Sequence, residues 1–251
     1  MSNLKDHDTN YTIEKMRNKS IDFKKILVGV DFNNILNLMG KKIRITENIV
    51  NHIKELRNNY CRVEGLDGIC KKKEVGGILG EDINNQEGSL VRIYSKIEKM
   101  FYGEGDAIAM NHNKKDDLMF HTHPDAFGTW NKSSPPSEFD LYHSLVLGTR
   151  GHNIVNLVWD RCGVYIYYLY PKIVKQLIGN TSVEGNRERL INLLRYTKMG
   201  FGFFWENKDY RGHFKTSDPT SFSRYRNLLK TMGFYVDFKP YGKEIDFIIP
   251  R

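Results

Sequence analysis

The chain has 251 residues, of which 40% are hydrophobic and 12% aromatic, so it is long and apolar enough to bury a core as one domain with extensions or as two small domains. No apolar run approaches the roughly 20 residues that a membrane helix needs, and the polar N-terminus lacks the apolar core of a secretory signal, so we expect a cytoplasmic protein with no membrane span. The three cysteines form no CxxC pair, which argues against a disulfide framework, and the formal charge of +8 bears on solubility and weak association with acidic partners more than on fold.

The N-terminal half of the chain predicts several strands and one helix. Charged and apolar residues alternate in KKIRIT as in a half-buried strand, and apolar residues at helical spacing follow. The stretch YCRVEGLDGICKKK, residues 60–73, is interpreted as a glycine-containing connection. In chain order, we expect strands at 24–32 and 41–46, a helix at 47–59, and strands at 74–81 and 89–101.

The C-terminal half predicts further strands, several helices and a hairpin. Aromatic and β-branched residues mark the strands, and Ser, Thr, Pro and Gly residues mark the ends of the helices. In FYVDFKPYGKEIDFIIP, residues 234–250, the turn signal from Pro240 to Lys243 predicts a closing hairpin. The expected strands lie at 117–123, 152–160 and 162–170, and the expected helices lie at 137–148, 171–180, 186–200 and 217–233.

One stretch of the chain, from His121 to Asp140, contains side chains that could bind a single metal ion. Successive side chains of a strand point to opposite faces, so His121 and His123 project from the same side. Ser137 is interpreted as the N-cap of the helix that follows, and Asp140 in its first turn can face back toward the histidines. Two neutral imidazoles and one carboxylate are a ligand set that zinc accepts, and three protein ligands leave a fourth position open for catalysis.

A general base for such a site is found upstream, in KKKEVGGILGE. Glu74 stands at the mouth of a short apolar strand, where Gly76 and Gly77 allow close approach of a neighbouring backbone. A solvated charge at the start of a strand is the simpler interpretation of Glu74, and Glu81 is a competing base. The position of Glu74 favours it over Glu81.

Three other side chains near this stretch have two interpretations each. Phe127 and Trp130, in the loop after His123, either plug that loop or form a substrate-contacting lip beside the metal, with the plug favoured. His143, three residues after Asp140, shares its helix face and is either a partner of the ligands or a rival ligand.

These residues resemble the JAMM signature of the JAB/MPN metalloprotease family: Glu74 followed by VGGILG, then His121-Thr-His123-Pro, then Ser137-Glu-Phe-Asp140. By this resemblance His121, His123 and Asp140 would hold a zinc ion, Glu74 would activate its water, and Ser137 would stabilise the tetrahedral intermediate. The gap at 124–136 is longer than the family usually shows.

The resemblance and a change in composition beyond residue 180 divide the chain. We expect an α/β fold, with a JAB/MPN-like domain at 41–180 whose mixed β-sheet is flanked by helices. An N-terminal extension occupies 1–40, and a small α+β region at 181–251 packs on the domain or selects the substrate. Removing the residues after 180 is therefore expected to change substrate choice more than metal content.

The function that the resemblance implies is hydrolysis of an isopeptide or peptide bond by a zinc isopeptidase. Proteins similar to this chain commonly remove ubiquitin or a ubiquitin-like modifier from lysine side chains, so we expect such conjugates as substrates and an activating protein partner. One alternative is a non-catalytic MPN-type scaffold, although such scaffolds typically lack the metal ligands that this chain keeps. Another is a RadC-like nucleic-acid-binding protein that uses the basic, aromatic C-terminal region, and salt-sensitive binding would support it.

Overall fold

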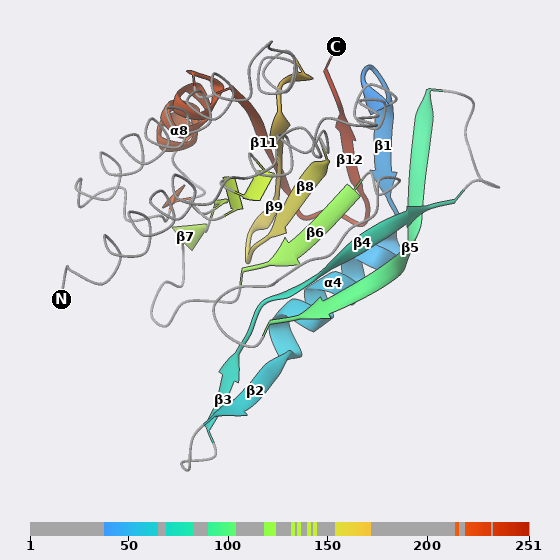
Figure 1. Ribbon diagram of the computed structural model, residues 1–251, viewed down its shortest axis with the longest axis vertical. Helices are drawn as coiled ribbons and strands as arrows, with labels where there is room; N and C mark the ends of the chain where they lie inside the picture. The colour runs from blue at the N-terminus through green and yellow to red at the C-terminus, as the bar shows by residue number, and fades with distance from the viewer. Residues whose placement is uncertain are drawn as a thin grey trace, which may run out of the picture.

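A mixed β-sheet of eight strands forms the centre of the computed structural model (Figure 1). The structure describes residues 38–64, 69–82, 90–103, 118–123, 132–133, 135–136, 140–141, 143–144, 154–171, 214–215, 219–231 and 233–250. Along the sheet, the strands are β11 (Phe234–Pro240), β9 (Gly163–Leu169), β8 (Val155–Trp159), β6 (Leu118–Thr122), β4 (Val75–Glu81), β5 (Val91–Tyr102), β1 (Lys42–Ile45) and β12 (Ile245–Ile248). The pairs β6–β8 and β1–β5 are parallel, and the remaining pairs are antiparallel.

The sheet curls until it is nearly a barrel. Its two edge strands, β11 and β12, are consecutive in the chain and are joined by residues 241–244 alone. Such a connection spans less than about 20 Å, whereas a flat sheet of eight strands would be about 33 Å wide. The two edges must therefore approach each other, and β11 and β12 do make contacts.

The predicted hairpin at 234–250 is wrong in its pairing. Both strands form where the pattern predicts them, but β11 pairs with β9 and β12 pairs with β1. A local turn signal reports that the chain reverses and does not report which strands the two arms will meet.

The other strand predictions that fall on described residues are confirmed. The strands expected at 41–46, 74–81, 89–101, 117–123, 152–160 and 162–170 are β1, β4, β5, β6, β8 and β9. The strand expected at 24–32 and the helix expected at 186–200 lie outside the described residues, as does the helix expected at 171–180 beyond its first residue.

The helix α4 (Glu47–Asn59) packs on one face of the sheet, as its apolar spacing predicts. Ile49, Val50 and Ile53 are buried, and they share a core with alternate residues of the strands, among them Phe120 of β6 and Leu157 of β8. Residues that lie opposite each other in paired strands point to the same face of the sheet, and successive residues of one strand alternate between the two faces. The residues that alternate with these core residues therefore point away from α4.

The opposite face of the sheet therefore carries Gly76, His121, Val158 and Tyr165, which lie opposite one another from β4 to β9. The helix α8 (Pro219–Thr231) contacts this face, since the ring of its Phe222 lies 6.0 Å from that of Tyr165. As predicted, α8 ends before Gly233, which has a φ of 86° that suits glycine.

Among the described residues, two small sheets accompany the large one. The strands β2 (Cys61–Glu64) and β3 (Ile69–Lys72) form an antiparallel pair that projects beyond the end of the large sheet (Figure 1). The connection predicted at 60–73 is therefore a pair of strands. The second small sheet pairs β7 (Lys132–Ser133) with β10 (Phe214–Lys215).

The architecture confirms a mixed α/β sheet but not the surrounding layer of helices that the resemblance implies. In the described part of the chain, two helices of 13 residues each, α4 and α8, accompany the curled sheet. The predicted boundaries at 40 and 180 stay predictions, although β11 and β12, from 181–251, belong to the same sheet as β1. No helix among the described residues is both long enough and apolar enough to cross a membrane.

Candidate metal centre

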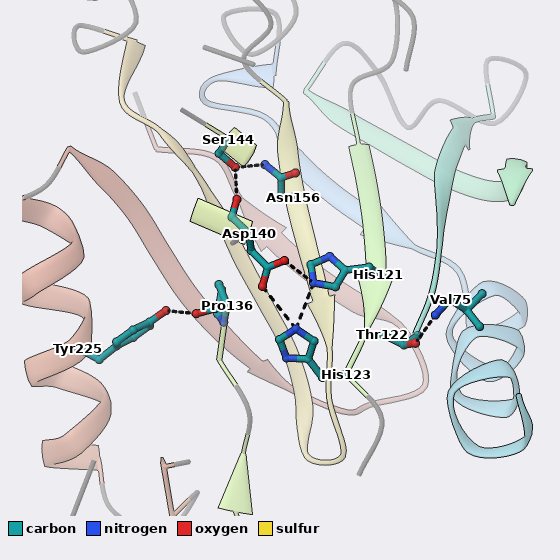
Figure 2. Close-up of polar contacts among 9 residues, drawn as sticks. All are labelled: Val75, His121, Thr122, His123, Pro136, Asp140, Ser144, Asn156 and Tyr225. Atoms are coloured by element: carbon teal, nitrogen blue, oxygen red, sulfur yellow. Dashed lines mark hydrogen bonds and ion pairs between the residues drawn. The ribbon is translucent and has the colours of Figure 1, made fainter. Parts of the chain in front are cut away.

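Two buried histidines lie at the end of β6, on the face away from α4. His121 is in the strand and His123 directly follows its last residue. Their Nε2 atoms are 3.2 Å apart, and the residues are only 4% and 8% exposed (Figure 2). The spacing of two residues in the sequence predicts this shared face, and the structure confirms it.

Asp140 completes the cluster from a helical stretch that follows in the sequence. Its Oδ1 lies 3.0 Å from Nε2 of His121, and its Oδ2 lies 3.4 Å from Nε2 of His123. Figure 2 shows the carboxylate directed at both rings. The expectation that Asp140 faces back toward the histidines is therefore confirmed.

The spacing of these atoms fits the binding of one metal ion. Ligands that each lie 2.0–2.1 Å from a tetrahedral zinc ion are separated from one another by about 3.3 Å. The two Nε2 atoms are 3.2 Å apart, one carboxylate oxygen of Asp140 lies 3.0 Å from that of His121, and the other oxygen lies 3.4 Å from that of His123, so each separation is close to the value expected around one ion. Two imidazoles and a carboxylate also match the donor types that zinc prefers.

Asp140 is in the charge state that can bind a metal. Burial alone would raise the pKa of Asp140, but positive charge on and hydrogen bonds from the adjacent His121 ring, and less strongly the His123 ring, hold that pKa well below its usual value. Asp140 is therefore a carboxylate at neutral pH, which is the form that binds a metal.

The main chain of His123 is fixed from two sides. Its N–H donates to the carbonyl of Trp159 at 2.8 Å, which extends the ladder between β6 and β8. Its carbonyl accepts a hydrogen bond of 3.1 Å from Nε of Arg57, a buried residue in the last turn of α4. The helix on one face of the sheet thus helps to position a ligand on the other.

Glu74 directly precedes β4, beside the end of β6. In the ladder Gly76 lies opposite His121, so Glu74, two residues earlier, projects from the same face as the histidines. The main chain around it is held on both sides, because its carbonyl accepts from the N–H of Gly103 at 2.9 Å and the N–H of Val75 donates to Oγ1 of Thr122 at 2.9 Å.

The carboxylates of Asp140 and Glu74 both influence the pKa of one buried hydroxyl on this face, that of Tyr167. Burial, then the charge of Asp140, and more weakly that of Glu74, raise the pKa of Tyr167 well above its usual value. Glu74 is therefore within electrostatic reach of the same hydroxyl as Asp140, although it is not part of the metal-ligand cluster.

Polar contacts dock the helical stretch of Asp140 onto β8. The Oγ of Ser144 donates to the carbonyl of Asp140 at 3.2 Å and accepts from Nδ2 of Asn156 at 3.2 Å (Figure 2). Nδ2 of Asn156 also donates to the carbonyl of Ile154 at 3.0 Å, so the amide is fixed to its own strand. Asp140 is thereby tied to the sheet that carries the histidines.

Several predicted residues lie elsewhere. Ser137, Phe127 and Trp130 fall outside the described residues, so the roles predicted for them stay predictions. Glu81 lies at the far end of β4, about 20 Å along the strand from Glu74, and it binds Nη1 of Arg92 at 2.6 Å. Within the described residues, His143 is not among the metal-binding group of His121, His123 and Asp140.

The sequence pattern did not single out the residues that support the cluster. Arg57 follows Ile49 and Ile53 at intervals of four, so a charge on the apolar stripe of α4 was the signal for its buried role. Asn156 is a polar residue within an otherwise apolar buried strand, which is a comparable signal. Ser144 had none.

Comparisons of the chain with protein-family models, with curated proteins and with solved structures found no match.

Proposed function

We propose that this chain is a zinc-dependent isopeptidase of the JAMM type, which hydrolyses an isopeptide or peptide bond to ubiquitin or a ubiquitin-like modifier. The observation that carries the proposal is the buried cluster of His121, His123 and Asp140, because its ligand atoms have the spacing and donor types that suit one zinc ion. The JAMM-like order of residues and the position of Glu74 support it.

Each residue near the cluster would have a separate task. When bound, zinc supplies Lewis acidity, which polarises a carbonyl group and lowers the pKa of water to about 7. Glu74 would take a proton from that water and pass it to the nitrogen of the leaving amine. Ser137 would donate a hydrogen bond to the carbonyl oxygen of the substrate as negative charge develops there.

The substrate class follows from this chemistry and from the resemblance. An amide carbonyl is unreactive, so it needs polarisation, a base and an acid for the leaving nitrogen, and the proposed residues supply these together. Ubiquitin-type conjugates in the cytoplasm and an activating partner are proposed on the resemblance alone. A scaffold role has less support, because the three metal ligands are retained and are already gathered.

The first test measures zinc and cleavage in the same samples. Purified wild type, His123→Ala and His52→Ala would be loaded with zinc, dialysed, and analysed for metal content and for cleavage of an isopeptide-linked ubiquitin dimer. His52 is the matched control, because it lies on α4 with its side chain exposed. We expect about one zinc ion per chain in wild type and His52→Ala, and loss of both zinc and cleavage in His123→Ala.

The result could overturn the proposal at two points. Wild type that retains no zinc, or His123→Ala that retains as much as wild type, would show that the cluster does not bind the metal. Zinc bound at the cluster without cleavage of ubiquitin dimers or of other modifier conjugates, even with cell extract added as a source of partners, would leave a metal site and reject the isopeptidase.

A further inference from the structure

Residues 124–139 join His123 to Asp140, and we call them the linking segment. A candidate metal ligand flanks it at each end, so the path of the segment affects where Asp140 lies. The described residues within it are Lys132, Ser133, Pro135 and Pro136. Ser133 and Lys132 pair with β10, and Pro136 accepts a hydrogen bond from α8, so both described parts of the segment contact the region beyond residue 180.

The helix α8 is firmly placed on the face of the sheet that carries the site. The ring of Phe222 lies 6.0 Å from that of Tyr165 on β9 and 6.2 Å from that of Phe238 on β11. Tyr225 and Leu229, three and seven residues further on, are buried on the same stripe of the helix. The helix is therefore a fixed support for whatever Tyr225 binds.

Tyr225 binds the linking segment. Its hydroxyl donates to the carbonyl of Pro136 at 3.0 Å, and Figure 2 shows it reaching from α8 toward the side of the cluster on which Asp140 lies. Tyr225 is 2% exposed, and Pro135 and Pro136 are buried. The proline ring already restricts φ at Pro136, so fixing its carbonyl leaves the main chain of this residue little freedom.

Strand pairing holds the segment at a second point. Lys132 and Ser133 of β7 lie opposite Lys215 and Phe214 of β10 in an antiparallel pair. The strand β10 in turn contacts α8, which begins four residues after it. Both attachments therefore come from one continuous piece of the chain, residues 214–231, and both act on the linking segment before Asp140.

We propose that β10 and α8 clamp the linking segment at its described residues, and that Tyr225 is a positioning residue that fixes Pro136, four residues before Asp140 in the sequence, relative to the sheet that carries His121 and His123. The region beyond 180 would then complete the site from within the same chain. The effect of this clamp on catalysis rests on the proposed isopeptidase function. The contacts that form the clamp do not depend on that function.

The variant Tyr225→Phe tests the clamp, because it removes one hydroxyl and keeps the ring that packs on the sheet. Tyr168→Phe is the matched control: Tyr168 is equally buried but lies on the face of the sheet toward α4. Hydrogen–deuterium exchange would be followed in peptides that cover residues 132–141 of the full-length, zinc-loaded protein. In Tyr225→Phe we expect exchange there to be about tenfold faster, with no change in the same peptides of Tyr168→Phe.

Steady-state kinetics of the same variants test whether the clamp affects catalysis. We expect kcat of Tyr225→Phe to fall about tenfold, because Ser137, the residue proposed to stabilise the transition state, directly follows Pro136 in the sequence. KM and zinc content should change by less than about twofold, because Asp140 is still held by Ser144. Unchanged exchange in residues 132–141 of Tyr225→Phe would overturn the clamp, whatever the activity. Faster exchange with unchanged kcat would overturn the positioning role. If wild type cleaves no conjugate, the proposed function fails, and the exchange result alone decides the clamp.

Discussion

At the scale of single residues, the candidate ligands are held by contacts that do not involve a metal. The main chain of His123 is bonded to Trp159 and Arg57, and that of Asp140 to Ser144. Ligands fixed in this way lose little conformational freedom when an ion binds, so the site is organised before binding.

Glu74 is predicted to act on the proton and not to hold the metal. Glu74→Gln keeps the shape of the side chain and removes its basicity, so we expect zinc content to stay at about one ion per chain while the rate of hydrolysis falls by about 10²–10⁴-fold. Elemental analysis and single-turnover cleavage of a ubiquitin dimer would measure the two effects. Glu81→Gln, at the other end of β4, is the control and should keep its activity. Full activity of Glu74→Gln would mean that another group is the base.

The ligands could be predicted from sequence because strand geometry fixes their relation. Two histidines at i and i+2 share a face in any strand, and a carboxylate in the first turn of the next helix can reach back to them. Tyr225 could not be predicted in this way. Its partner Pro136 is 89 residues away in the sequence, and no local spacing connects an aromatic residue in one helix to a carbonyl in a distant loop.

At the scale of elements, the position of Asp140 depends on how its helical stretch meets β8. The contact is polar, through Ser144 and Asn156, and both residues are buried. A buried hydrogen bond has a defined direction, whereas an apolar contact tolerates sliding, so this contact sets the register of the helix on the strand.

Loss of this contact should weaken zinc binding. For Ser144→Ala we expect about 1 kcal/mol lower stability and about tenfold weaker zinc affinity, because a residue that orients a ligand typically contributes 10–100-fold. Urea denaturation and competition with a chelator would measure these. Ser95→Ala is the control: Ser95 also donates to an acidic residue, Asp82 at 3.3 Å, but lies on β5 away from the cluster. Equal zinc affinity in Ser144→Ala and wild type would show that the docking contact does not matter to the ligands.

Helices and strands with strong local sequence signals were predicted well, whereas the pairing between strands was not. The apolar spacing of 47–59 and the Gly233 stop of α8 were confirmed, since both depend on neighbouring residues. The pair β2–β3 was missed because the two glycines between its strands and the lysines of β3 are typical of a loop. The arms of the predicted hairpin at 234–250 pair with strands from distant parts of the chain.

At the scale of the whole molecule, the region beyond residue 180 supplies both edges of the sheet. Its strands β11 and β12 bury Phe234, Val236, Ile245 and Phe247. At about 1.5–3 kcal/mol for each buried side chain, their removal would cost on the order of 6–12 kcal/mol, which is comparable to the 5–15 kcal/mol that stabilises a typical domain. Of the two roles expected for this region, the structure favours packing on the rest of the domain, and the role in substrate choice stays a prediction.

A chain that ends at residue 180 is accordingly predicted to lose its fold, and its zinc with it. Circular dichroism should show no cooperative unfolding in urea, and dialysis should leave less than stoichiometric zinc, because the face that carries His121 no longer has its support. The full-length protein treated in parallel is the control. A truncated chain that unfolds cooperatively and keeps one zinc ion would show instead that the remaining strands are sufficient.

The near-closure of the sheet also has a consequence for synthesis of the protein. Ile45 of β1 pairs with Ile245 of β12, so the partner of an early strand is made about 200 residues later. At the usual 5–20 residues per second, β1 leaves the ribosome about 10–40 s before β12 exists. During that time β1 has an open edge, which is a surface on which other chains can assemble. The strand β12 thus also caps the edge of β1, and a chain released before β12 is made would be prone to aggregate.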